Sequence, residues 1–265
     1  MALSTHGRPG LPQRMSVHAL GVSASPRANG GTSVLVQAAL LGAREVSGTT
    51  TEYVTLAGKT VQPCNGCFPC LKAGRCVIED DMQPLYEQLL AADVILVGSP
   101  AYFGSASSLC KAFMERVEGF GVSDKKLRLK VGGVITTAGS RNGGQETAAI
   151  GIQLWMHVND MLPVGVTTPV AQWGVTGNTG FDPDDVHRDV IRFTPWPKEL
   201  GTPSRAVESM LSKELAWIYG RKLATVATIV QAGLATSGLD LPDKPYGWNL
   251  PAEYPPELYE IGGSS

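Results

Sequence analysis

Four of the five cysteines lie close together, in the segment CNGCFPCLKAGRC. They are Cys64, Cys67, Cys70 and Cys76, and their spacing is C-x2-C-x2-C-x5-C. Three thiolates that are two residues apart can bind three corners of a cuboidal 4Fe-4S cluster, and a fourth thiolate after a short loop can bind the last corner. In a reducing compartment, such crowding indicates metal or redox chemistry rather than disulfides.

Two other interpretations of these cysteines stay open. They could form a redox-sensitive or structural thiol loop, or they could bind zinc, although structural zinc sites usually use two separated cysteine pairs. The fifth cysteine, Cys110, lies in an expected helix, where we expect a small buried hydrophobic residue rather than a ligand.

A second candidate site is the hydroxyl-rich segment SASPRANGGTS, residues 23–33, between an apolar run and an expected helix. The N–H groups at a helix N-terminus lack partners within the helix and carry partial positive charge, which suits a phosphate. Arg27 and Asn29 add further donors. Neither GxGxxG nor GxxxxGK[ST] occurs here, so the loop favours a mononucleotide over NAD or ATP. The alternative is a polar turn that only caps the helix.

Two further loops could border a flat ring. Residues 99–105, SPAYFGS, follow the most apolar run of the chain, and Tyr102 and Phe103 could stack on a ring. Residues 138–146, AGSRNGGQE, offer backbone N–H groups with little steric bulk. Each loop alone resembles an ordinary turn, but three loops at one edge of a sheet would form a cofactor pocket.

The elements that must position these loops alternate between strand and helix. Strands are expected at Val17–Val22, Thr51–Leu56, Val94–Val97, Val131–Thr137 and Val164–Val170. Helices are expected at Thr32–Glu45, Met82–Ala91, Ser107–Glu118 and Gln145–Met161. This order predicts an α/β fold with a doubly wound, five-stranded parallel sheet and right-handed crossovers. In such sheets, ligands bind beyond the carboxyl ends of the strands.

The chain divides into three predicted parts. Residues 1–14 are expected to be a disordered leader, 15–170 the nucleotide-binding domain with the cysteine loop, and 171–265 a C-terminal extension. The extension contains a loop, a long helix at Arg205–Leu234 and a tail rich in proline and aromatic residues. An apolar helix face outside the core would need a partner surface, so we expect a homodimer or homotetramer.

Charge and hydropathy exclude several classes of function. The formal charge is −2 over 265 residues, so no large positive field predicts nucleic acid or an anionic membrane as a partner. No apolar run is long enough for a membrane span, and residues 1–14 lack the apolar core of a signal peptide. We therefore expect a cytoplasmic protein.

The segments SASPRANGGTS, GSPAYFGSASSLCKAFMERV and AGSRNGGQE, in this order, resemble the flavin loops of the NAD(P)H-dependent FMN reductase group of flavodoxin-like proteins. The resemblance covers about residues 16–170 and implies a flavodoxin-like fold that binds FMN. At the first loop it implies, around the FMN phosphate, Ser23, Ser25, Pro26, Arg27, Asn29, Gly30, Thr32 and Ser33. Along the isoalloxazine it implies Pro100, Ala101, Tyr102, Phe103 and Gly104, with Ala138, Gly139, Gly143 and Gly144 at the other edge.

The cysteine segment and the following VIEDDM resemble the compact motif of the iron-sulfur flavoproteins. This resemblance implies a 4Fe-4S cluster on the four crowded cysteines. The expected activity is an FMN-dependent oxidoreductase that accepts hydride from NAD(P)H and passes electrons to a small-molecule or protein acceptor. Because the flavin carries the chemistry, no catalytic acid or base is expected. The alternative is a non-catalytic electron carrier or redox sensor that a protein donor reduces.

Overall fold

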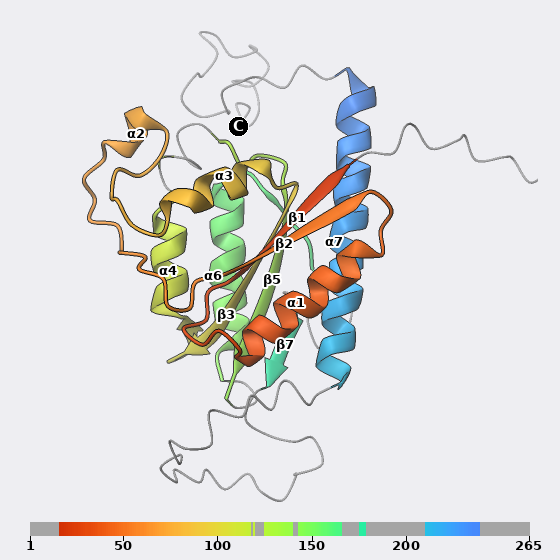
Figure 1. Cartoon of the computed structure of the whole chain (residues 1–265), viewed down its shortest axis with the longest axis horizontal. Coiled ribbons are helices and arrows are strands. Elements are labelled where there is room, and N and C mark those ends of the chain that lie inside the picture. Colours follow the sequence, from red (N-terminus) through yellow and green to blue (C-terminus); the bar gives the residue numbers. More distant parts are fainter. Residues whose placement is uncertain are drawn as a thin grey trace, which may run out of the picture.

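A parallel β-sheet forms the centre of the computed structural model, which describes residues 16–117, 119, 125–139, 143–165, 175–178 and 210–238. Four long strands lie side by side in the order β2-β1-β3-β5 (Figure 1). They are β1 (Val17–Ser23), β2 (Thr49–Thr55), β3 (Val94–Tyr102) and β5 (Val131–Ala138). The expected doubly wound α/β fold is confirmed, with the second strand on one side of the first and the third strand on the other.

Both faces of the sheet are buried. Successive residues of its inner strands point to opposite faces, and the side chains on both faces lie in hydrophobic clusters. In β3, Ile95 and Val97 belong to one hydrophobic cluster, whereas Val94 and Leu96 belong to another. The continuous apolar run that predicted this strand is thus explained by helices on both of its faces.

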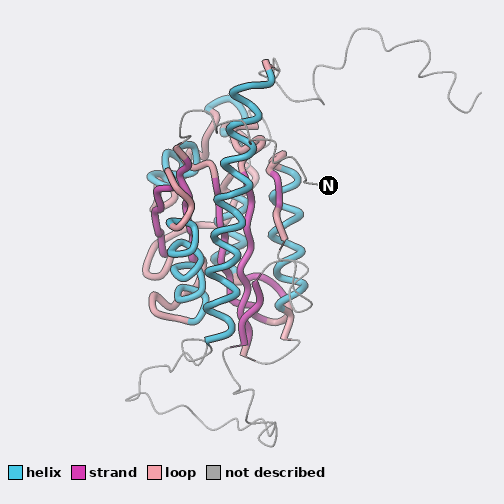
Figure 2. The backbone as a smooth tube through the Cα atoms, turned by 90° about the vertical axis from the view of Figure 1, so that its right-hand side faces the viewer, coloured by secondary structure: helices cyan, strands magenta, loops and turns pink. Residues whose placement is uncertain are grey.

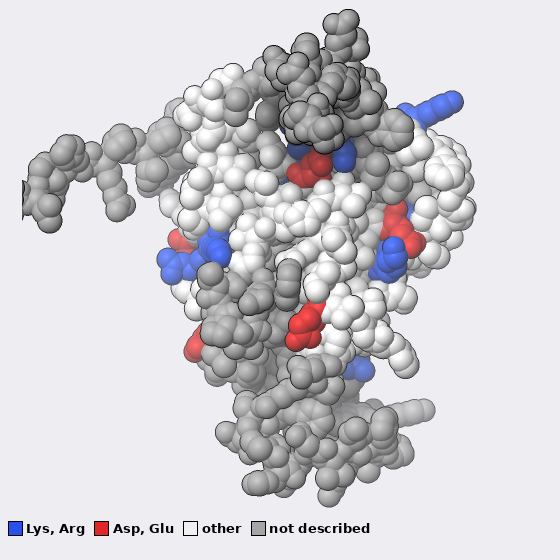
Figure 3. Space-filling view, turned by 180° about the vertical axis from the view of Figure 1, so that it is seen from behind, with Lys and Arg blue, Asp and Glu red and all other residues white. Residues whose placement is uncertain are grey.

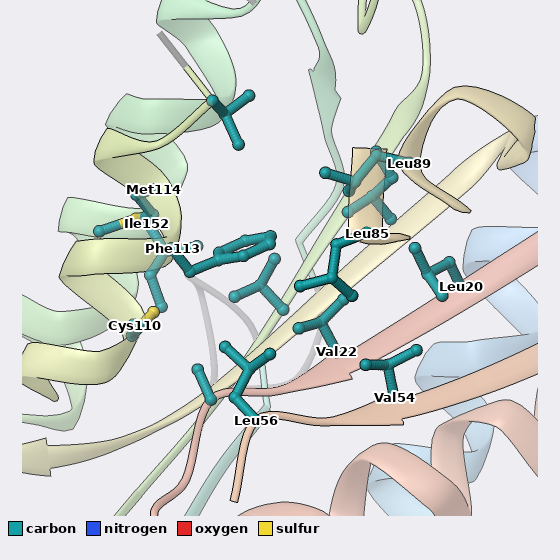
Figure 4. Packing of buried hydrophobic residues seen from close by; sticks show 14 of the residues in the cluster. Leu20, Val22, Val54, Leu56, Leu85, Leu89, Cys110, Phe113, Met114 and Ile152 are labelled. Atoms are coloured by element: carbon teal, nitrogen blue, oxygen red, sulfur yellow. The ribbon is translucent and has the colours of Figure 1, made fainter. Parts of the chain in front are cut away.

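Helices cover the sheet as two layers (Figures 1 and 2). On one face lie α3 (Gln83–Ala91), α4 (Ser108–Glu115) and α6 (Gln145–Val158). Figure 4 shows part of their core, where Cys110 and Phe113 of α4 and Leu85 of α3 point toward Val22 of β1. On the other face lie α1 (Gly31–Arg44) and α7 (Met210–Ser237). The short elements are α2 (Cys70–Ala73), β4 (Ser105–Ala106), β6 (Leu162–Pro163) and β7 (Val175–Asn178).

The fifth strand differs from the expected one at Val164–Val170. Instead, β6 pairs with the start of β5 and β7 pairs with its end, while residues 166–170 lie outside the described part of the chain. Between the two short strands, the Tyr219 hydroxyl accepts a hydrogen bond from the Val134 N–H at 3.0 Å and donates one to the carbonyl of Val164. A side chain of α7 therefore supplies hydrogen bonds that a continuous strand would otherwise make. The local sequence did not indicate this contact.

Helix α7 belongs to the core, although we expected it outside. Ala216, Tyr219 and Leu223 lie in one hydrophobic cluster with α1 and the sheet. The two helices approach closely at two glycines: a Cβ on Gly42 would lie 1.9 Å from the Trp217 carbonyl oxygen, and one on Gly220 would lie 1.7 Å from that of Ala39. This packing removes our reason for a partner surface on α7, and the oligomeric state stays a prediction. The expected leader, the first residues of the expected helix and the tail lie outside the described residues.

The described surface carries basic and acidic side chains among broad uncharged areas on the face shown in Figure 3. Although α7 has 28 residues, no helix among the described residues combines the length and the apolar character that a membrane span requires.

We predict that Gly220→Ala destabilises the protein even though alanine is the better helix former. The added methyl would overlap the backbone of α1, and such overpacking costs about 1–3 kcal/mol. Gly233→Ala is the matched control on the same helix, because nothing lies within 4 Å of its added Cβ. Urea denaturation should therefore show a lower free energy of unfolding for Gly220→Ala and an equal or higher one for Gly233→Ala. Equal behaviour of the two variants would show that α7 does not pack against α1 in this way.

Candidate functional site

The three expected cofactor loops meet at the carboxyl ends of β1, β3 and β5. The parallel register pairs Ser23 of β1 with Gly98 of β3, and Pro100 of β3 with Thr137 of β5. Because each loop follows directly, residues far apart in sequence reach one edge of the sheet. The structure thus brings together the residues that the sequence predicted for one pocket.

The first loop presents the start of helix α1, which has no side-chain cap at its N-cap residue Gly30. Buried hydroxyls surround this helix end: Ser23 and Ser33 are hydrogen bonded at 2.9 Å, and Thr32 is bonded to Thr137 of β5 at 2.7 Å. Ser25, also buried, accepts a hydrogen bond from the backbone N–H of Arg27. The side chains of Pro26, Arg27 and Asn29 are exposed at the outer side of the loop.

The second loop is a tight hairpin. Strand β4 turns back on the end of β3, so that Tyr102 pairs with Ser105. The two residues between them, Phe103 and Gly104, have φ of 49° and 78°, the left-handed conformations of a two-residue hairpin turn. The turn projects the Phe103 ring fully into solvent beside the half-exposed Tyr102. Pro100 is buried and Ala101 partly buried beneath them.

The third loop touches the second loop through glycine. Ala138 ends β5 as a buried residue, Gly139 is exposed, and residues 140–142 lie outside the described part of the chain. Gly144 has φ of 96°, and a Cβ on it would lie 2.4 Å from the Cα of Gly104. The close approach of the two loops therefore requires a residue without a side chain at position 144. The preceding residue, Gly143, is half-exposed.

Three polar residues of this site were not among the predicted cofactor contacts, although Ser99 lies in the predicted second loop: Ser99, Ser107 and Thr137. The Ser107 hydroxyl caps α4 by accepting from the N–H of Cys110 at 3.1 Å, and it donates to the carbonyl of Ala24 in the first loop at 2.8 Å. Ser99 Oγ accepts from the Ser107 N–H at 3.0 Å. A serine before a helical pattern is a recognisable cap signal. Its contact with the first loop depends on the register of β1 and β3 and has no local signal.

This edge of the sheet fits a flavin mononucleotide. The uncapped start of α1 and the buried hydroxyls suit a phosphate, since N–H and O–H donors stabilise its negative charge. The exposed aromatic hairpin and the glycine contact behind it offer a surface on which a flat ring can lie.

The cysteine loop lies elsewhere, at the C-terminal end of α4 (Figure 1). The chain leaves β2 beside the first loop, where the Leu56 N–H donates to the Ser23 carbonyl, but it then reaches the other end of α4. There the Cys64 N–H donates to Glu115 at 3.3 Å. A loop that leaves β2 begins at the same sheet edge as the first loop. Helix α4, about 12 Å long, lies between its own N-cap Ser107 and the cysteines. The strand order therefore predicts where the cysteine loop begins, but it does not predict the path of the loop from there to the end of α4.

Arg116 closes the cysteine loop at both of its ends. This buried guanidinium donates to the Gln62 carbonyl before the first cysteine and to the Ile78 carbonyl after the last. It also binds both carboxylate oxygens of Asp80, at 2.6 and 3.0 Å. Burial disfavours the charged form of Asp80, but the Arg116 hydrogen bond and two backbone N–H groups outweigh it and lower the pKa of the carboxyl below its usual value. The pair therefore stays charged at neutral pH.

The four thiols differ in exposure, and three of them act electrostatically on the fourth, Cys70. Cys64 and Cys67 are exposed, whereas Cys70 and Cys76 are buried. Burial raises the pKa of the Cys70 thiol, and the other three thiols raise it further by electrostatic repulsion. In the part of the chain that the structure describes, no three potential ligands gather around a single metal ion. A cuboidal cluster spreads its thiolates more widely, because each binds a different iron atom, and four cysteines on one loop that Arg116 closes fit it.

Cys110 is separate from this group, as predicted. It is completely buried in the core of α4, and burial raises the pKa of its thiol to about 12. The thiol therefore stays neutral and acts as a small hydrophobic side chain.

Comparison with known proteins is consistent with this site. Residues 16–174 match the family model of NADPH-dependent FMN reductases. An iron-sulfur flavoprotein of Methanocaldococcus jannaschii is 40% identical over 73% of this chain and 98% of its own length. An iron-sulfur flavoprotein of Methanosarcina thermophila is 39% identical over 55% of this chain and 75% of its own length. Among solved structures, RosB with a bound 8-demethyl-8-formylriboflavin-5'-phosphate intermediate has a TM-score of 0.56 at 16% identity, over 91% of this chain and 96% of RosB. At that identity, the similarity shows the fold alone.

We predict that Ser107→Ala weakens both the fold and cofactor binding. The change removes the cap of α4, worth about 1 kcal/mol, and the hydrogen bond that ties α4 to the first loop. The free energy of unfolding should fall by about 1–3 kcal/mol, and titration of the apoprotein should show FMN binding weakened several-fold. The control is Ser108→Ala, whose side chain is exposed. If both variants match the wild type, Ser107 does not link the two loops.

Proposed function

Because the chain belongs to the NADPH-dependent FMN reductase family, it is an FMN flavoprotein oxidoreductase, and we propose that it accepts hydride from NAD(P)H and passes electrons to a small-molecule or protein acceptor. The observation that carries this proposal is the shared position of the uncapped α1 start, the buried hydroxyls and the aromatic hairpin at one sheet edge.

The first loop would hold the FMN phosphate. The free N–H groups at the start of α1 would face it, with hydroxyls of Ser25 and Thr32 beside them and the exposed guanidinium of Arg27 closing the outer side. Thr137, bonded to Thr32, fixes this end of α1 against β5. These groups would position the phosphate and compensate its negative charge. None of them would transfer a proton.

The second and third loops would hold the ring. When bound, FMN supplies the hydride-accepting and electron-donating chemistry. Tyr102 and Phe103 offer aromatic surface to its ring, and the backbone of Gly143 and Gly144 offers N–H groups to its polar edge. The rigid hairpin and the Gly104–Gly144 contact keep both loops in place. We propose no catalytic acid or base in this chain.

We further propose that Cys64, Cys67, Cys70 and Cys76 hold a 4Fe-4S cluster, which would supply one-electron transfer. The spacing of the cysteines, their place on one loop that Arg116 closes and the names of the relatives support this assignment. A thiol loop without a cluster is the alternative at the same residues.

One observation favours a second function, an electron carrier or redox sensor. Cys64, Cys67 and Phe68 are exposed together, so a protein partner could reach the cysteine loop directly. A cytoplasmic location and a homodimer or homotetramer remain proposals for either function, with no nucleic acid or membrane as a partner.

Anaerobic reduction by nicotinamides tests the proposed activity. We predict that FMN, identified by mass spectrometry, copurifies with the protein and that its absorbance bleaches rapidly with NADH or NADPH. An FAD mass would contradict the mononucleotide site. Bound FMN that only a reduced protein donor can bleach would instead support the electron carrier.

A further inference from the structure

Arg116 makes a fifth hydrogen bond, and its acceptor is a cysteine sulfur. Its Nε–H donates to Cys76 Sγ at 3.0 Å, while the four N–H groups of Nη1 and Nη2 bind Gln62, Ile78 and both oxygens of Asp80. A guanidinium has five N–H donors in a fixed plane, so all five are used. Rotation of the Arg116 side chain would break several of these bonds together, and the direction of the bond to Cys76 is therefore fixed.

This bond differs from the contacts that Cys64 and Cys70 make with backbone N–H groups. Cys64 Sγ accepts from the backbone N–H of Gly66 at a longer distance of 3.4 Å, and that donor is neutral. Hydrogen bonds from charged donors are shorter and roughly twice as strong as neutral ones. Arg116 and Cys76 are also buried, with 1% and 8% of their surfaces exposed, so water competes little for either atom.

A thiolate sulfur that binds iron keeps lone pairs that can accept a hydrogen bond. Such a bond withdraws electron density from the sulfur and stabilises the more negative, reduced state of a cluster, and hydrogen bonds to the sulfurs are among the features that set cluster potentials. The Arg116 charge is compensated by Asp80, whose carboxylate is also buried. The directed N–H···S bond, rather than net positive charge, is therefore the feature that acts on the cluster.

We propose that Arg116 is a positioning residue that holds Cys76 Sγ in its ligand position and raises the reduction potential of the cluster through its Nε–H. The proposal rests on the proposed function, because it requires the cluster. The same guanidinium joins the two ends of the loop, so the position of the ligand and the closure of the loop depend on one side chain.

The first test compares Arg116→Lys with Arg75→Lys in anaerobically reconstituted protein. Lysine keeps the charge but lacks the planar set of donors. Arg75 precedes Cys76 in sequence and is exposed, which makes it a matched control. Redox titration followed by EPR should show a more negative cluster potential for Arg116→Lys and a wild-type potential for Arg75→Lys. An unchanged potential in Arg116→Lys overturns the proposal.

The second test needs no substitution that could prevent folding. Wild-type protein labelled with 15N at arginine Nε is reduced, and pulsed EPR measures coupling between the cluster and nitrogen. We expect a 15N coupling that persists in Arg75→Lys. Its absence from a cluster-containing wild-type protein overturns the role of Arg116 even if Arg116→Lys fails to fold, while the proposed cluster stands. If reconstituted wild-type protein contains no iron and sulfide, the proposed cluster fails, and the proposal fails with it.

Discussion

The parallel order of β2, β1, β3 and β5 is the constraint on which the rest of the structure depends. Parallel neighbours must place their carboxyl ends at one edge, so loops from distant parts of the sequence meet there without any direct signal between them. The same order buries both faces of the sheet and requires a helix layer on each. The candidate cofactor site is therefore a consequence of strand order, and its particular chemistry comes from the short loops that follow each strand.

Helix α4 links the two candidate redox sites. Its N-cap Ser107 is hydrogen bonded to the first loop, whereas Arg116, just after its last turn, closes the cysteine loop. A buried arginine is costly unless every donor is paired, and the Asp80 carboxylate with three further acceptors meets that requirement. Because all five donors of Arg116 are paired, the backbone segments that it binds have few alternative positions. The helix thus fixes both sites relative to one core without bringing them next to each other.

The sequence predicted the features that depend on local pattern. Short apolar runs that alternate with expected helices located β1, β3 and β5, and the composition of the three loops indicated a cofactor site at the sheet edge where these strands end. Features that depend on distant contacts were not predictable: the fifth strand is divided, and Tyr219 of α7 hydrogen bonds between its two parts. Likewise, the apolar face of α7 was assigned to a partner, although Gly42 and Gly220 let it pack against α1. Arg116 had no local signal because its partners lie 36–54 residues away in sequence.

Phosphorus NMR of the bound cofactor tests the central claim most directly, namely that the phosphate of FMN lies at the start of α1 among buried hydroxyls. A free phosphate monoester takes up a proton at about pH 6. N–H and hydroxyl donors stabilise the dianion, which lowers that pKa. The account predicts a chemical shift of the bound phosphate that stays constant from about pH 8 to about pH 5. A bound phosphate that titrates like free FMN over this range would contradict it.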